Sequence, residues 1–221
     1  MPSLTLSPLE IQRVTSHNKQ SQAKGLEGNL HVAEWEDILN HFGGRCPFTG
    51  TYDISMDHFV PESLYHAGTF VGNVFPLHPS LNASKQDQNP YLWIQKQSLA
   101  YQEVFEHVVT FLADSLNMTL DEFREWVFWC FAHPRTPKDV SKDHKRGYVS
   151  SLSLFHHHQR LEQKKSRVLL HFAKNSGLEE EILFVQFADW CLTNGVPIEP
   201  SSFSSYISQL FSSNERRITP C

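Results

Sequence analysis

The feature that most constrains this chain is a break in helical periodicity between residues 45 and 90. The segment DISMDHFV (53–60) alternates apolar and polar residues, which is typical of a strand. NVFPL (73–77) predicts a second short strand, after a loop that contains two glycines. PSLNASKQ (79–86) opens on a proline and predicts a short helix. The expected order is therefore strand, loop, strand, helix.

The segments on either side of this break carry apolar residues at helical spacing. Asn29 is the expected N-cap of one such helix, and Thr119 with Glu122 three residues later forms a capping box at the start of another. The first helix has a thin apolar face, so it is either a solvated helix or a basic arm that lies on phosphates. We expect helices over residues 8–24, 30–42, 91–116, 119–133, 148–175, 178–194 and 200–212.

Together these patterns predict an α+β fold that is mostly α, with a small core wrapped by helices and a helical C-terminal domain. The segment PRTPKDVSKDHKRG is rich in proline and charge, which indicates a linker. The expected parts are N-terminal helices over 1–44, the small core over 45–90, helices that pack on the core over 91–133, the linker over 134–147 and the C-terminal domain over 148–221.

Composition limits the setting more than the function. The chain has 221 residues, enough for one compact domain with appendages or for two small domains. Its formal net charge of -5 does not predict a nucleic-acid partner, so DNA would have to meet local basic patches and a divalent cation. The four cysteines form no CxxC pair, which favours a reducing cytoplasm over a disulfide framework. No segment resembles a signal peptide or a membrane span.

The chemistry of the segment 45–90 lies in Asp57, His58 and Asn82. Asp57 and His58 are neighbours on the first strand, so their side chains point to opposite faces or diverge at its end. A carboxylate with an amide oxygen from the short helix is a hard-oxygen ligand set that suits Mg²⁺. Histidine has an ordinary pKa of about 6.5 and is suited to take a proton from water.

These residues stand in a pattern that resembles the HNH endonucleases, whose small core is the ββα-metal fold. The matching stretches, in order, are CPFTG (46–50), DHFVP (57–61), NV (73–74) and HPSLN (78–82) followed by Lys85. The segment DHFVPES is also similar to the HNH domain of CRISPR effector nucleases. The resemblance covers about a fifth of the chain, or nearer a quarter if the helix over 30–42 is included.

The resemblance implies a role for each matched residue. His58 would activate water for attack on phosphorus, and Asp57 with Asn82 would hold one Mg²⁺ or Mn²⁺. Asn73 would brace the loop between the strands and keep His58 aimed. Lys85 would contact phosphate, whereas His78 is either a further metal ligand or phosphate contact, or structural.

The implied partner is DNA, and the implied products carry 5′-phosphate and 3′-hydroxyl ends. The family implies a homing, nicking or restriction-type enzyme in the cytoplasm of a bacterium or a phage-infected host. A monomer with one such site would nick one strand, and a homodimer would cut both.

One departure from the family concerns zinc. Many HNH proteins bind a structural zinc through two CxxC pairs, and the four matching places here are Cys46, Thr49, His78 and Leu81. Two of these side chains are poor zinc ligands, so a closed tetrahedral site is not expected. We expect no structural zinc, a buried Cys46, and a hairpin whose underside is filled by packing.

Two other functions stay open at the level of sequence. The same fold can serve as a non-catalytic DNA-binding module, or as a subunit of a larger assembly such as a phage packaging complex. The C-terminal segments 178–194 and 200–212 resemble a helix-turn-helix, but a plain packing or dimerisation domain has the same pattern. The His156–His158 tract spreads over three faces of a helix and is not expected to chelate a metal.

Overall fold

The computed structural model describes residues 6–148 and 150–176, with side chains described as far as residue 165. The chain divides into two compact units, Met1–Phe155 and His156–Cys221. The first unit contains the whole segment 45–90, and the helix-turn-helix expected over 178–212 lies outside the described residues. Among the described helices, none is long and apolar enough to cross a lipid bilayer.

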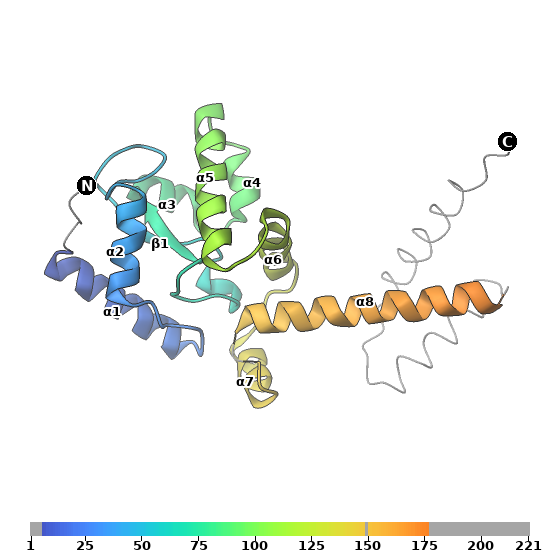
Figure 1. Ribbon diagram of the computed structural model, residues 1–221. Coiled ribbons are helices and arrows are strands. Elements are labelled where there is room, and N and C mark those ends of the chain that lie inside the picture. The colour runs from blue at the N-terminus through green and yellow to red at the C-terminus, as the bar shows by residue number, and fades with distance from the viewer. Residues whose placement is uncertain (1–5, 149, 177–221) are drawn as a thin grey trace, which may run out of the picture. The chain divides into compact units, whose positions relative to one another are not determined.

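The described chain is mostly helical with one small antiparallel sheet (Figure 1), which confirms the expected fold class at that level. β1 (Ser55–His58) pairs with β2 (Val74–Leu77) in the expected order, and α3 (Pro79–Lys85) follows directly. A 3-10 turn, η1 (Glu62–Leu64), lies in the loop between the strands. The other helices are α1 (Pro8–Ala23), α2 (Val32–His41), α4 (Pro90–Ile94), α5 (Leu99–Ser115), α6 (Leu120–Ala132), α7 (Pro137–Lys145) and α8 (Ser151–Ser176).

Two local expectations were wrong, and the segment expected to be a linker contains a helix. His31 and not Asn29 is the N-cap of α2, because the Glu34 carboxylate accepts a hydrogen bond from the His31 backbone amide at 2.6 Å. The helix expected over 91–116 is two helices, since Ser98 caps the start of α5 and separates it from α4. The expected linker over 134–147 contains α7, which a capping box between Thr136 and Asp139 begins.

The register of the sheet places Asp57 and His58 on opposite faces, as the strand pattern predicted. His58 stands opposite Val74, on the face that packs with Met56 against α1 and α2. Asp57 stands opposite Phe75, on the face that packs against α4, α5 and α6. The hairpin therefore lies between two apolar clusters, and its end presents a different chemical group to each side.

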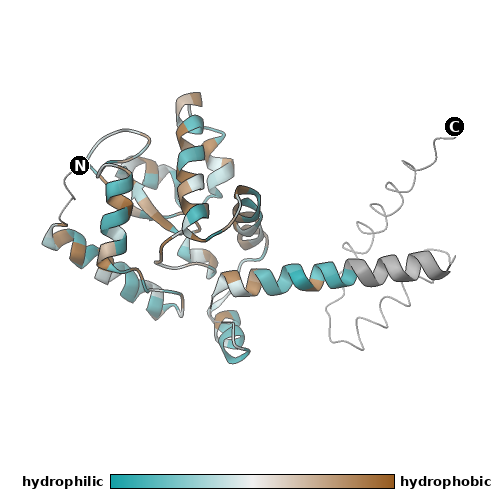
Figure 2. Ribbon diagram, in the orientation of Figure 1, coloured by the Kyte–Doolittle hydropathy of each residue, from teal (hydrophilic) through white to brown (hydrophobic). Residues whose placement is uncertain are grey.

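The apolar clusters account for the rigidity of this arrangement. Cys46 is fully buried in the larger cluster, as expected, where Phe42 and Leu81 also pack. The large cluster is rich in aromatic rings, with Phe59 stacked on Phe105 at a centroid distance of 5.7 Å. α7 is mostly hydrophilic (Figure 2), whereas every residue of β2 is buried. Close packing of this kind fixes side chains at the sheet in single positions.

Candidate active site beside the hairpin

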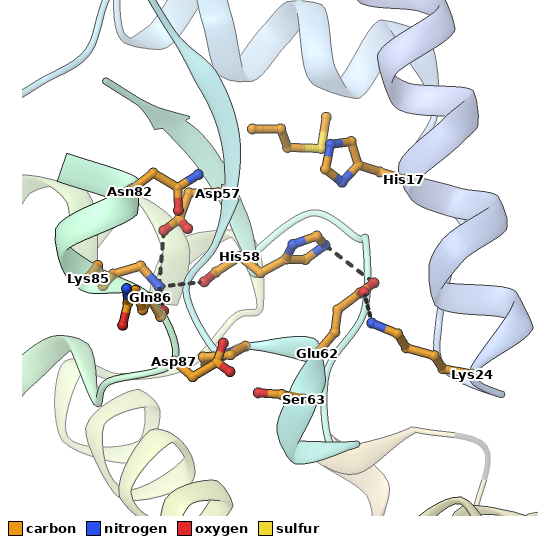
Figure 3. Close-up of a pocket in the computed structure, with 12 residues that line it drawn as sticks. His17, Lys24, Asp57, His58, Glu62, Ser63, Asn82, Lys85, Gln86 and Asp87 are labelled. Atoms are coloured by element: carbon orange, nitrogen blue, oxygen red, sulfur yellow. Dashed lines mark hydrogen bonds and ion pairs between the residues drawn. The ribbon is translucent and has the colours of Figure 1, made fainter. Parts of the chain in front are cut away.

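A cavity of about 330 Å³ opens where the end of β1 meets α1, η1 and α3 (Figure 3). Four of the residues singled out from the sequence line it, and they come from two elements. They are Asp57 and His58 at the end of β1, and Asn82 and Lys85 on α3. Two expected residues, Asn73 and His78, do not line the cavity.

Asp57 and Lys85 form a buried ion pair on the α3 side of the cavity. Their side chains approach to 3.2 Å, and the residues are only 5% and 1% exposed. Lys85 also donates hydrogen bonds to the backbone carbonyls of His58 (3.0 Å) and Gln86 (3.3 Å). Lys85 is therefore a buried partner of Asp57 that also lines the cavity, and its contact with phosphate stays a prediction.

The buried environment of Asp57 disfavours the charged form of its carboxyl group. Burial raises the pKa of Asp57 to about 6, although the ammonium group of Lys85 acts in the opposite direction. The Oδ2 atom is buried and, among the described residues, accepts no hydrogen bond of good geometry despite the nearby ammonium group. The charged partner of this oxygen is therefore the Lys85 ammonium group, at 3.2 Å.

Asn82 reaches the same side of the cavity from α3. Its amide nitrogen donates to the Ser55 hydroxyl at 3.1 Å, and Ser55 donates in turn to the Leu77 carbonyl at 2.9 Å. These bonds orient the side-chain amide, so that its oxygen faces away from Ser55. In Figure 3 the oxygen-bearing ends of Asp57 and Asn82 point into the same part of the cavity.

His58 lies on the other face of the strand, against α1. Its Nε2 atom is 2.8 Å from the Thr69 hydroxyl and 3.6 Å from the Glu62 carboxylate. The His17 ring lies beside it at a centroid distance of 5.5 Å. Burial lowers the pKa of His58 to about 4, although the Glu62 carboxylate opposes this. His58 is therefore neutral at physiological pH, the state a proton acceptor requires.

Glu62 is held by two residues of the α1 segment. Lys24 donates to Oε2 at 2.6 Å, and the Ser21 hydroxyl donates to Oε1. Burial raises the pKa of Glu62, but the hydrogen bonds from Lys24 and Ser21 outweigh it and leave that pKa below its usual range. A carboxylate thus faces His58 from the η1 turn.

Asn73 is fully buried and ties together the loop between the strands. Its amide nitrogen donates to the carbonyls of Val60 (3.1 Å) and Gly68 (2.9 Å), and its oxygen accepts from the Val60 amide at 2.8 Å. These bonds hold the chain directly after His58. The position of Asn73 matches the bracing role expected of it.

His78 has a local structural role instead of a place at the cavity. It is the N-cap of α3, and its Nδ1 atom accepts a hydrogen bond from the Ser80 backbone amide at 3.2 Å. Its Nε2 atom lies 3.6 Å from the carboxylate of Asp53, which is largely exposed. Of the two alternatives left open for His78, the N-cap is a structural role, and His78 is not among the residues that line the cavity.

The sequence reasoning missed the residues that surround His58. Glu62 stands in the same DHFVPES segment, and its spacing of four from His58 was a usable signal because Pro61 leads into a helical turn. Ser21, Lys24 and Thr69 carried no usable signal, since they are far from the motif in sequence and ordinary in type.

The oxygen atoms of Asp57 and Asn82 are the candidate ligands for a divalent metal. Within residues 6–148 and 150–165, no group of three or more His, Cys, Asp and Glu side chains is placed to hold a metal ion. Asp57, whose carboxylate is paired with Lys85, and Asn82 with its amide oxygen are nevertheless two hard oxygen donors that line the cavity. This set fits a cation such as Mg²⁺, which keeps several waters and takes other oxygens from a phosphate.

Comparison of the chain with protein-family models, with curated proteins and with solved structures found no match.

Proposed function

We propose that this chain is a metal-dependent endonuclease that hydrolyses DNA phosphodiester bonds, with a ββα-metal core of the HNH type. The observation that carries the proposal is the convergence of Asp57, Asn82 and His58 on one cavity. The two oxygen ligands come from one side of the hairpin and the imidazole from the other. A phosphodiester between them would meet a charge-stabilising group and a proton acceptor together.

In this proposal His58 accepts the proton of the attacking water. A neutral imidazole is the competent state, and the lowered pKa of His58 keeps it in that state at pH 7. Asn73 holds the loop after His58, and the apolar clusters hold the strand, so the imidazole is positioned before substrate arrives.

Asp57 and Asn82 would hold Mg²⁺ or Mn²⁺. When bound, the metal supplies Lewis-acid stabilisation of charge on the phosphate and on the leaving oxygen. Asp57 provides the anionic ligand, and the bond from Asn82 to Ser55 keeps the neutral ligand turned toward the cavity. Lys85 neutralises Asp57 in the resting protein and limits the cost of burying that carboxylate.

The net charge of the chain requires a local basic surface for DNA, and α7 supplies one. Lys138, Lys142 and Lys145 are exposed and line a shallow hollow together. Their spacing of four and three residues places them on one face of the helix. Such a row neutralises successive phosphates without reading sequence, which suits DNA binding of low specificity.

A second candidate is a DNA-binding module of the same fold without catalysis. The observation that favours it is the Lys85 ammonium group, which already stands 3.2 Å from Asp57 and repels a second cation. Binding of DNA without any cleavage product in Mg²⁺ or Mn²⁺ would identify this candidate.

The test is incubation of the purified chain with supercoiled plasmid in Mg²⁺, in Mn²⁺ and in EDTA. The proposal predicts nicked or linear product with either metal and none in EDTA. An Asn82→Ala variant should need more metal for half-maximal rate, whereas Asn82→Asp, which keeps an oxygen ligand, should stay closer to the wild type. Cleavage that EDTA does not suppress would contradict the metal-dependent mechanism.

A further inference from the structure

We propose that a chain of hydroxyl groups fixes the tautomer of His58, so that Nε2 carries the ring proton and Nδ1 is the proton acceptor. The chain runs from Glu62 through Ser21 and Thr69 to His58. Its consequence for catalysis rests on the proposed nuclease function, but the tautomer itself does not. Thr69 and Ser21 are thus assigned as positioning residues for the base.

The direction of the chain is set at Glu62. An ionised carboxylate only accepts hydrogen bonds, and the Lys24 ammonium at 2.6 Å favours that ionised form. The Ser21 hydroxyl lies in close contact with Oε1 of Glu62. Two acceptors at that separation would repel each other, so the Ser21 proton points at Glu62.

The next link is the pair formed by Ser21 and Thr69, whose hydroxyl oxygens are 2.8 Å apart. A serine hydroxyl has one proton, and that of Ser21 is already directed at Glu62. Ser21 therefore accepts from the Thr69 hydroxyl, and it also accepts from the Thr69 backbone amide at 2.9 Å. The single proton of the Thr69 hydroxyl is then directed at Ser21.

The last link decides the state of the imidazole. Thr69 Oγ1 lies 2.8 Å from Nε2 of His58 and has no second proton to donate. A hydrogen bond at that distance requires Nε2 to be the donor. Neutral imidazole carries one ring proton, so Nδ1 is left with its lone pair free to accept.

The Nδ1 atom of His58 is available to accept a proton. Nδ1 makes no hydrogen bond among the described residues, and in Figure 3 it lies on the side of the ring away from Glu62. Glu62, 3.6 Å from Nε2, also stabilises the imidazolium that forms when Nδ1 takes a proton. The arrangement has the logic of a carboxylate that orients a catalytic histidine, with two hydroxyl groups added to the connection.

The hydroxyl chain is held rigidly by the backbone around it. Ser21 and Thr69 are both fully buried. The Thr69 carbonyl accepts from the amides of Asn29 and Leu30, which ties the loop to the segment after α1. At Gly68 an added Cβ would lie 2.1 Å from the Glu27 carbonyl oxygen and 2.9 Å from Ser21 Cβ, so the loop is in close contact with α1 and with the segment after it.

The direct test is the protonation state of each ring nitrogen of His58, measured by long-range ¹H–¹⁵N correlation on the full chain labelled at histidine. A His58→Gln variant assigns the resonances. We expect a pyrrole-type Nε2 and a pyridine-type Nδ1 in the wild type. A majority tautomer protonated at Nδ1 would overturn the inference, whether or not the protein cleaves DNA.

Two variants of Thr69 test the cause. Thr69→Val removes the hydroxyl at nearly constant volume and should shift the tautomer populations, whereas Thr69→Ser keeps the hydroxyl and should retain them. The rate constant kcat should fall roughly tenfold to a hundredfold in Thr69→Val and recover in Thr69→Ser, with KM little changed. Unchanged populations in Thr69→Val would overturn the role of the hydroxyl chain. Absence of cleavage by the wild type would instead count against the nuclease function alone.

Discussion

Two regions of the first unit contain buried titratable groups with atoms that make no hydrogen bond. The two regions differ in the volume of the cavity beside those groups. The first is the cavity at Asp57 and His58, with a volume of about 330 Å³. The second is a hollow of about 10 Å³ lined by Glu27, His66 and Arg135. The first is large enough for a group the size of a phosphate, whereas the second has room for about one water molecule.

The polar groups of the hollow resemble those of the cavity in other respects. Burial raises the pKa of Glu27 to about 7 and lowers that of His66 to about 4, with a backbone hydrogen bond to His133 opposing the latter. Glu27 Oε2, His66 Nδ1 and Arg135 Nε have no hydrogen-bond partner among the described residues. Shifted pKa values therefore indicate a site only where substrate also has room.

The largest expected effect on the free energy of unfolding comes from breaking the Asp57–Lys85 ion pair. Asp57→Asn leaves the Lys85 ammonium buried without its counter-charge, and should lower the free energy of unfolding by about 3–5 kcal/mol. The double variant Asp57→Asn/Lys85→Met should recover most of this loss. Urea denaturation at pH 7 measures both. A loss below about 1 kcal/mol in the single variant would mean that Lys85 reaches solvent.

A smaller effect is expected on the pH dependence of stability, through His66 in the hollow. The pKa of His66 is about 4 in the folded chain against an ordinary value of 6.5, so the folded state binds fewer protons between these values. Stability must therefore fall as pH falls from 6.5 toward 4. In His66→Gln, whose amide can still donate to the His133 carbonyl, this dependence should weaken by about 2 kcal/mol over that range. Parallel stability curves for the two proteins would show that His66 does not titrate as described.

The smallest effect is expected at Glu27. Its folded-state pKa of about 7 exceeds the ordinary 4.5, so the folded state holds a proton between these values and stability falls as pH rises through them. Glu27→Gln mimics the protonated form. It should raise the free energy of unfolding by about 1 kcal/mol at pH 8 and leave it nearly unchanged at pH 4. Thermal unfolding at the two pH values compares them, and equal shifts at both would argue against a titrating Glu27.

The sequence predicted the central elements of the fold because their signals are local. The alternation in DISMDHFV predicted β1, the segment NVFPL predicted β2, and the proline that opens the short helix predicted α3. The capping box at Thr119 and Glu122 gave the start of α6. The helix in 134–147 was missed because its composition outweighed the capping signal of Thr136 and Asp139.

The candidate site was predictable only on the side that lies within one motif. Asp57, His58 and Asn82 belong to a short stretch with fixed spacing, and they line one cavity. The partners of His58 were not predictable, because Ser21 and Lys24 reach it through packing of α1 on the loop and not through sequence spacing. The burial of Lys85 beside Asp57 was not predictable either, because a sequence motif carries no information on burial.

Plasmid cleavage by the wild type, His58→Ala and His66→Gln, assayed in parallel, tests whether the cavity at His58 is the active site. Burial lowers the pKa of both histidines, but of the two only His58 lines the cavity beside the hairpin. The account predicts metal-dependent cleavage by the wild type and by His66→Gln, and a loss of roughly a hundredfold or more in His58→Ala. Equal cleavage by His58→Ala and the wild type would contradict the assignment of the cavity as the active site.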